Sequence, residues 1–325
     1  MTVLHLVEAV LFVTGAAALL LCWLWLAERI TARVPRRRRR AVLGSLWLAP
    51  ALASVTLYLV WPLVNTVVLS LRDATSRHWA GVANYRYLRD DAAVHSALRN
   101  NVLWLVLLTG VCLTVGLLVA TLADRVRYEA IAKAVVVLPT AIPFVAGAVI
   151  WRFMYQYQPP GLPQTGTVNA VWTQLTGAAP LAWLVDTRTN NVALVAVGIW
   201  MSTGFATVIL SAALKSIPPE LRDAARVDGA GAWQVFRYVS LPHLRPTIIV
   251  TTTLLAITAF KAFDIVYVMT NGNFDTDVIA NLMYRQLFVD RDYGHASAIA
   301  VLLAAVAVPI LLLNARATRP ERETP

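Results

Sequence analysis

Long apolar runs decide what this 325-residue chain can fold into. A helix crosses a bilayer core with about 20 mostly apolar residues, and in lipid it satisfies its own backbone hydrogen bonds. Hydrophobic residues make up 58% of the sequence and charged residues only 14%, which excludes an ordinary soluble domain. We therefore predict an all-α polytopic membrane protein with about seven transmembrane helices. The apolar runs cover residues 3–27, 42–70, 101–123, 131–153, 191–214, 246–268 and 297–315.

Arginine-rich segments indicate how the chain lies across the membrane. Five consecutive arginines, Arg36 to Arg40, follow the first run, and the positive-inside rule places this loop in the cytoplasm. Alternate loops counted from there put the basic segments near Arg127 and Arg226 on the same side, together with the tail that carries Arg319. We therefore expect the N-terminus outside and the C-terminus in the cytoplasm. The net charge of +10 then belongs to loops that face anionic lipid, and no nucleic-acid partner is expected.

Residues 218–242, PPELRDAARVDGAGAWQVFRYVSLP, form a charged amphipathic stretch between two apolar runs, on the cytoplasmic side. The pattern predicts two short helices with a bend at Gly229 and Gly231, where glycine permits it. Ser216 is expected to cap the first helix, and Leu241-Pro242 to end the second. Such a stretch is either a docking element for another protein or a hairpin that lies on the membrane surface.

This stretch resembles the cytoplasmic loop of permease subunits of bacterial ABC importers. The signature of that loop is Glu-Ala-Ala, then Gly, then Ile-x-Leu-Pro. The chain has Asp223-Ala224-Ala225, then Gly229, then Val239-Ser240-Leu241-Pro242. Asp223 is one methylene shorter than the usual glutamate, which bears on how it reaches a basic partner, whereas Val239 in place of isoleucine is conservative.

Other stretches resemble the carbohydrate-uptake branch of this family. GVANYRYL at 81–88 is similar to its Gly-x-x-Asn-Tyr segment, and FKAFDIVYVMTNG at 260–272 is similar to its Phe-Asp-x-x-Tyr-x-x-Thr-x-Gly run. The run TGFATVILSAAL at 203–214 and the extra first helix are most similar to permeases of the α-glucoside type. The resemblance covers nearly the whole chain.

The resemblance implies a type I importer permease core in the last six helices, preceded by one accessory span, in the bacterial inner membrane. The chain would form half of the pathway for an oligosaccharide or α-glucoside. Its implied partners are a second homologous permease, two ATP-binding subunits, an extracytoplasmic sugar-binding protein and membrane lipid. ATP and Mg would bind to the ATPase, and this chain would bind no cofactor. ATP binding would bring the ATPases together and shift the loop as a rigid body, which opens the pathway outward.

The resemblance also divides the chain and assigns residues to the contact with the ATPase. The accessory helix and basic loop span residues 1–41, the permease domain spans 42–315 with a coupling loop at 216–245, and the cytoplasmic tail is 316–325. The implied coupling residues are Glu220, Asp223, Ala224, Ala225, Asp228, Gly229, Ala230, Leu241 and Pro242.

A sugar offers hydroxyls that need hydrogen bonds and C–H faces that pack on aromatic rings, so its path should mix polar and aromatic side chains. The fifth and sixth apolar runs and the residues after them supply both kinds, although aromatic residues near membrane ends also form interfacial belts. Lys261 and Asp264 are charges within an apolar run, and they either form an internal ion pair or face the path. The candidate pathway residues are Trp200, Thr203, Phe205, Phe260, Phe263, Asp264, Tyr267 and Asn271.

Catalytic motifs are absent from the sequence. It contains no Gly-x-x-x-x-Gly-Lys-Ser/Thr loop, no HExxH, no Gly-x-Ser-x-Gly elbow and no cluster of His and carboxylate at ligand spacing. We expect a transport subunit rather than an enzyme, with no catalytic residue and no metal site. Two rival functions stay open: an importer permease for another solute, such as an osmolyte or amino acid, and an ion-coupled secondary transporter. Interrupted helices, which often mark the latter, are not evident in the sequence.

The outer loop at residues 154–190 is long and rich in Pro, Gly, Thr and Gln, with an apolar patch at 168–175. We expect it to fold as an outward cap. The cap either receives a substrate-binding protein or simply connects two helices.

Overall fold

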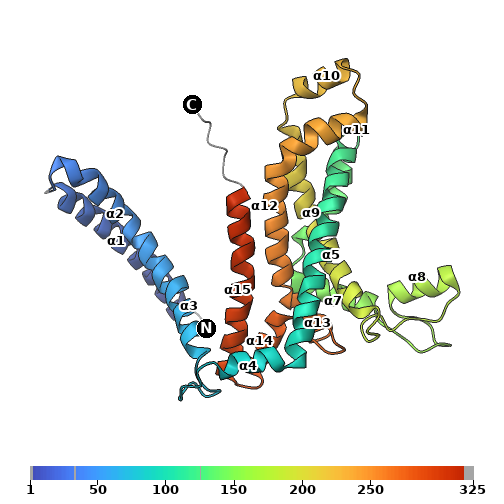
Figure 1. The fold of residues 1–325 in the computed structure, drawn as a ribbon, viewed down its shortest axis with the longest axis horizontal. Coiled ribbons are helices and arrows are strands. Elements are labelled where there is room, and N and C mark those ends of the chain that lie inside the picture. The colour runs from blue at the N-terminus through green and yellow to red at the C-terminus, as the bar shows by residue number, and fades with distance from the viewer. Residues whose placement is uncertain (1–2, 33, 125, 318–325) are drawn as a thin grey trace. The chain divides into compact units, whose positions relative to one another are not determined.

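The computed structural model describes residues 3–32, 34–124 and 126–317 (Figure 1). The chain divides into two compact units, residues 1–68 and 69–325. Within the described ranges no strand is formed, apart from an isolated bridge between Arg72 and Trp79. The prediction of an all-α fold is therefore confirmed. The unit boundary reflects packing, whereas the domain boundary at residue 41 rests on the resemblance and stays a prediction.

The first unit contains a helical hairpin. Its two long helices pack against each other, and the indole Nε1 of Trp23 donates a hydrogen bond to the backbone oxygen of Leu46 over 2.9 Å. Large apolar side chains from Trp47 to Val64 are exposed, as expected for a surface that faces lipid. The elements of this unit are α1 (Val3–Ala32), α2 (Arg36–Val55), the π-helix η1 (Thr56–Val60) and α3 (Trp61–Leu69).

The second unit is a helical bundle with short helices at both ends (Figure 1). Its elements are α4 (Ala83–Asp90), α5 (Ala92–Ala123), α6 (Glu129–Val137), the 3-10 helix η2 (Leu138–Ala141), α7 (Phe144–Met154), α8 (Thr167–Thr176), α9 (Asn190–Lys215), α10 (Pro219–Val227), α11 (Ala232–Gln234), the π-helix η3 (Val235–Ser240), α12 (Leu241–Phe260), α13 (Phe263–Met269), α14 (Ile279–Phe288) and α15 (Tyr293–Ala317).

Four helical stretches of the described chain are long and apolar enough to cross a membrane, or five if a bent pair counts as one span. A shorter apolar helix covers residues 293–309. The predicted count of seven spans therefore stays a prediction. The four stretches are Val42–Leu69, Ala92–Ala123, Asn190–Lys215 and Ala232–Met269.

The predicted span 131–153 is not one straight helix, and this expectation is wrong. α6 with η2 and α7 meet at an angle of 100°. Ile142 is extended, with ψ 130°, as the residue before a proline prefers, and Pro143 has no backbone N–H to continue the ladder. The chain therefore contains an interrupted helix that a reading of apolar runs did not reveal.

α9 lies at the centre of the bundle and packs against α5, α6, α7, α12 and α13. Its approach to α5 depends on glycine at two places. A Cβ added to Gly116 would lie 2.9 Å from the Cβ of Ala206, and one added to Gly198 would lie 2.7 Å from the Trp104 ring. Larger residues at either position would force the two helices apart. The buried side chains around this contact include Trp104, Leu108, Leu194, Val197, Leu255 and Val266.

Candidate functional site

The short helix α10 begins with two prolines. Pro218 is the N-cap and Pro219 occupies the first turn, where the missing N–H has no helical partner to lose. The expectation that Ser216 caps this helix is wrong, because its hydroxyl donates to the carbonyl oxygen of Ala213 at the end of α9. A single residue, Ile217, therefore separates the C-cap of α9 from the N-cap of α10.

Gly229 ends α10 as predicted for the bend. Its φ of +85° lies in the left-handed region that glycine adopts without cost. The N–H of Gly229 donates to the oxygen of Arg226 over 3.0 Å, and the N–H of Ala230 donates to the oxygen of Ala225 over 2.9 Å. These two bonds form a Schellman motif, which satisfies carbonyls that the end of a helix leaves free.

The helix after the bend runs straight into a long span. Gln234 Oε1 accepts the N–H of Gly231 over 2.7 Å, and α11, η3 and α12 then follow one another without an intervening residue. The prediction that Leu241-Pro242 ends the second helix is wrong. Leu241 donates to the oxygen of Phe236 in a π turn, and this wider turn gives the ring of Pro242 room that an α-turn would deny it.

All nine residues of α10 are described, and none is buried. Asp223 forms an ion pair of 3.1 Å with Arg226, and both side chains are more than 60% exposed. One further ion pair, 3.8 Å from Arg222 to Asp124 at the C-terminus of α5, ties α10 to the bundle. The helix lies at one end of the bundle (Figure 1). Most of its side chains are exposed and the rest are partly exposed, so a partner can reach them. Of the predicted coupling residues, Glu220, Asp223, Ala224, Asp228, Gly229 and Pro242 are exposed, and Ala225, Ala230 and Leu241 are partly exposed.

Lys261 and Asp264 lie at a break between α12 and α13. Together with Trp104 and Phe144 they line a cavity of about 210 Å³. No ion pair between them is formed in the described part of the chain, so the structure favours the interpretation that they face a cavity. The indole Nε1 of Trp104 is buried and has no hydrogen-bond partner among the described residues.

The other pathway candidates are not gathered in that cavity. Trp200 packs edge-on against Trp151, with ring centroids 5.6 Å apart. Phe263 and Tyr267 instead stack on each other at 5.1 Å. Thr203 is buried, Phe260 is partly exposed, and Phe205 and Asn271 are exposed.

Two aromatic residues that the sequence did not single out complete the cluster on α13. Tyr284 lies 5.2 Å from the ring of Phe263 and 5.1 Å from that of Tyr267, and Phe288 lies 4.8 Å from Tyr284. The only signal in the sequence is their i,i+4 spacing, which fits one face of a helix. These four rings make an aromatic surface between α13 and α14.

A set of side chains that we call the amide clamp holds the opposite end of the bundle. Asn100 Nδ2 donates to the backbone oxygens of Asp275 and Asp277, over 2.8 Å in each case. Asn190 Nδ2 donates to the oxygen of Phe274 over 2.6 Å, and Asn101 Oδ1 accepts the N–H of Ile279 over 2.8 Å. The clamp is defined as Asn100, Asn101 and Asn190 with the loop 274–279.

The clamp also contains charged groups. Ser96 and Arg99 both contact the Asp275 carboxylate, and this hydrogen bonding holds its pKa below the usual value. Asp277 lies 3.0 Å from Arg285, but burial outweighs that partner and raises the pKa of its carboxyl. The clamp was not predicted, although the paired asparagines at 100–101 and 190–191 are visible at the starts of two apolar runs.

The outer loop 154–190 is held together by the buried side chain of Asn169. Its Oδ1 accepts hydrogen bonds from the N–H of Leu181 and the indole of Trp183, both over 3.0 Å, and its Nδ2 donates to the oxygen of Leu181 over 2.9 Å. Asn169 thereby fixes α8 against the returning chain. Whether this cap receives a binding protein stays a prediction.

The sequence of this chain matches a known protein family and its members. The family described as binding-protein-dependent transport system inner membrane component matches residues 112–319. The osmoprotective compounds uptake permease protein GgtC of Synechocystis sp. is 48% identical over 271 residues, which are 83% of this chain and 97% of that protein. The chain belongs to this family.

Other relatives of this binding-protein-dependent component agree. The α-glucoside transport system permease protein AglF of Rhizobium meliloti is 43% identical over 276 residues, 84% of this chain and 82% of that protein. The crystal structure of a bacterial alginate ABC transporter, in complex with an alginate pentasaccharide-bound periplasmic protein, matches the fold with a TM-score of 0.74. It covers 88% of this chain and 97% of that chain, at 23% identity.

Family membership confirms several predictions. The chain is a multi-pass inner membrane component of a binding-protein-dependent importer, and it is a transport subunit rather than an enzyme. The matched residues 112–319 lie within the second unit and include the whole coupling loop 216–245. The individual coupling and pathway residues stay predictions.

Proposed function

We propose that this chain is one of two permease subunits of an ATP-driven importer that carries an oligosaccharide or α-glucoside. The observation that carries this proposal is the exposed helix α10, which ends in a defined turn and offers its side chains to a partner. The N-terminus would lie outside and the C-terminus in the cytoplasm, because the basic loops then face the inner leaflet. The resemblance of the chain to sugar permeases and its identity with the Rhizobium protein support a sugar as the solute.

The assembly would contain a second homologous permease, two ATP-binding subunits and an extracytoplasmic sugar-binding protein. ATP and Mg would bind to the ATP-binding subunits, and this chain would supply the mechanical link. Closure of the ATPase pair would push α10 as a rigid body. The push would reach the bundle through η3 and α12, because α11, η3 and α12 are contiguous.

The cavity beside Lys261 and Asp264 is the best candidate for contact with the solute inside the membrane. It combines the apolar rings of Trp104 and Phe144 with the hydroxyl of Thr258 and two charged groups. Charged residues within a span commonly mark a solute path.

A second solute class is an osmoprotective compound, and one observation favours it. The relative from Synechocystis sp. is more similar to this chain than the Rhizobium permease and is named for osmoprotective compounds. The interrupted helix at residues 138–143 is a feature often found in secondary transporters, so ion coupling also needs a test.

The test is uptake by the complete importer, purified with its partners from the native membrane and reconstituted in liposomes. We expect uptake of maltose or trehalose that requires ATP and the binding protein, and that glycine betaine does not inhibit. Inhibition by glycine betaine would identify an osmoprotective solute instead. Uptake by this chain alone, driven by an ion gradient without ATP, would overturn the importer proposal.

A matched pair of variants tests the coupling element in the same assay. Gly229→Pro removes an N–H that bonds to Arg226 and cannot adopt φ +85°, so we expect transport to be lost while the complex still assembles. Gly177→Pro is the control, because Gly177 also ends a helix with a positive φ, of +65°, but in the outer loop. Equal uptake by the Gly229→Pro variant and the unmodified importer would contradict the role of α10.

A further inference from the structure

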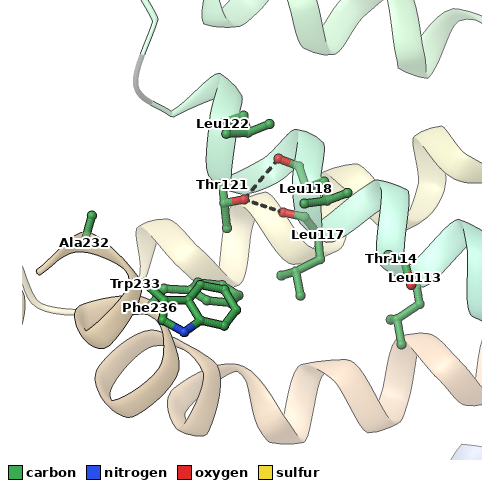
Figure 2. A pocket seen from close by; sticks show the side chains of 9 residues that line it. All are labelled: Leu113, Thr114, Leu117, Leu118, Thr121, Leu122, Ala232, Trp233 and Phe236. Atoms are coloured by element: carbon green, nitrogen blue, oxygen red, sulfur yellow. Dashed lines mark hydrogen bonds between the residues drawn. The ribbon is translucent and has the colours of Figure 1, made fainter.

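An apolar groove separates α5 from α11 and η3, at the start of the long stretch Ala232–Met269 (Figure 2). It has a volume of about 500 Å³. One wall is a stripe of α5 from Leu113 to Leu122, and the facing wall consists of Ala232, Trp233 and Phe236. Figure 2 shows the two aromatic rings beside each other, opposite the leucine side chains.

The two threonine hydroxyls in these walls already have hydrogen-bond partners within α5. Thr114 donates to the oxygen of Gly110, and Thr121 donates to the oxygens of Leu117 and Leu118. The remaining polar side-chain group is the indole N–H of Trp233, a residue that is 71% exposed. Tryptophan with an apolar ring and one donor is typical of the level of lipid headgroups. The groove therefore suits an apolar chain rather than a polar ligand.

The length of the groove matches one leaflet. Residues 113 to 122 of a helix span about 14 Å at 1.5 Å per residue. The hydrocarbon core of a bilayer is about 30 Å thick, so this is roughly half of it. Leu118 and Leu122, which are 52% and 60% exposed, would face hydrocarbon along this length.

A basic pocket adjoins the groove and shares Thr121, Ala232 and Phe236 with it. It has a volume of about 310 Å³, and its charged lining is Arg222, Arg226 and Asp124. Two guanidinium groups thus line the pocket with one carboxylate, and a second carboxylate, that of Asp223, pairs with Arg226 from outside the lining. Arg222 lies 3.8 Å from Asp124 and Arg226 donates one bond to Asp223, so most of their N–H donors stay open. Such forked donors suit a phosphate group.

We propose that an anionic phospholipid of the cytoplasmic leaflet occupies this site, with an acyl chain in the groove and its phosphate against Arg222 and Arg226. This inference rests on the membrane orientation in the proposed function. Because both arginines belong to α10, the lipid ties the coupling helix to the membrane surface. The response of the ATPase to a loaded binding protein then depends on the headgroup present.

The experiment uses the complete importer in nanodiscs of phosphatidylcholine, with a phosphatidylglycerol probe that carries a photoreactive acyl chain. We expect the label on peptides that contain residues 113–122 and Trp233, with competition by unlabelled phosphatidylglycerol but not by phosphatidylcholine. One basic residue near a membrane contributes about 1 kcal/mol to attraction of anionic lipid, which is about fivefold in affinity. Arg222→Gln and Arg226→Gln should each weaken labelling about fivefold.

Arg188→Gln is the control, because it removes an exposed arginine from the outer loop and should leave labelling unchanged. Equal competition by the two lipids would overturn the site. Absence of the label from residues 113–122 and Trp233 in the complete importer would also overturn it, because the second permease would then cover the groove. Labelling is measured without transport, so failure of sugar uptake in the same preparation would refute the proposed function and leave the lipid site standing.

Discussion

The amide clamp and helix α10 lie at opposite ends of the second unit, and they differ in how firmly they are bonded to the rest of the bundle. In the clamp, asparagines from α5 and α9 donate to carbonyl oxygens and accept one backbone N–H of a loop that lies 84 to 178 positions further along the chain. Phe274 and Asp275 have φ of +59° and +62° there, a conformation that side chains other than glycine rarely adopt. α10 has its own Schellman turn, one long ion pair and no buried residue.

The comparison shows where the fold fixes backbone and where it leaves a surface free. A left-handed residue other than glycine costs about 1–2 kcal/mol, so the loop 274–279 keeps its shape only because buried amides hold it. α10 needs no such support because its turn uses glycine. A rigid body that moves with a partner benefits from internal bonds and few bonds to its surroundings, which is the arrangement around α10.

The largest loss of stability should come from the clamp. Asn100→Ala leaves the buried oxygen of Asp277 without its donor, which costs about 1–3 kcal/mol, whereas the oxygen of Asp275 keeps the bond from Asn191 Nδ2. We expect the free energy of unfolding to fall by about 1–3 kcal/mol, measured from tryptophan fluorescence of the detergent-solubilised protein. Asn191→Ala is the control, since it loses one bond of 3.1 Å, and equal losses in the two variants would break the comparison.

A smaller effect should follow from acidification. Hydrogen bonds from Ser96 and Arg99 lower the pKa of Asp275 from its ordinary value of 3.8, so its carboxylate stabilises the folded loop above that value. The contribution is lost as the pH falls below 3.8 and through the lowered pKa of the folded state. Amide exchange in residues 270–279, corrected for intrinsic rates, should therefore quicken relative to other loops as the pH falls from 5 to 3.

Asp275→Asn tests whether this carboxylate is the cause. The variant should show the faster exchange at pH 5 already, with little further change on acidification. Asp277→Asn is expected to slow amide exchange at pH 5 instead, because burial raises the pKa of Asp277 and its neutral form is favoured in the folded chain. An unchanged acid dependence in the Asp275→Asn variant would show that another group controls the loop.

Sequence patterns predicted the parts of this molecule that depend on local chemistry. Gly229 marks a left-handed turn because its neighbours are helical, and the apolar runs mark helices because lipid admits little else. The break at Ile142-Pro143 was missed although Pro139 and Pro143 were visible in the sequence. A count of apolar residues takes no account of the backbone hydrogen bond that proline removes. Pro242 was predicted to end a helix, but the helix continues through it because a π turn accommodates its ring.

The features that escaped prediction depend on partners far away in the sequence. Asn100 donates to a loop 175 positions later, and one sequence offers no signal for that pairing. The aromatic surface of Phe263, Tyr267, Tyr284 and Phe288 likewise joins two helices that only the fold brings together. Asp264 was selected for its charge within a span, and charge is a property that the sequence shows directly.

The smallest effect on stability should come from Asp223, and it would sharpen the comparison most. Its ion pair with Arg226 is exposed on both sides, and exposed pairs contribute about 0–1 kcal/mol. We expect Asp223→Ala to leave the unfolding temperature unchanged and to reduce the ATPase response to a loaded binding protein. Asp90→Ala removes a similarly exposed partner of Arg89 at the end of α4 and should change neither quantity. If Asp223→Ala leaves the ATPase response intact, this carboxylate does not contact the ATPase, and the docking surface of α10 must rest on its other exposed residues.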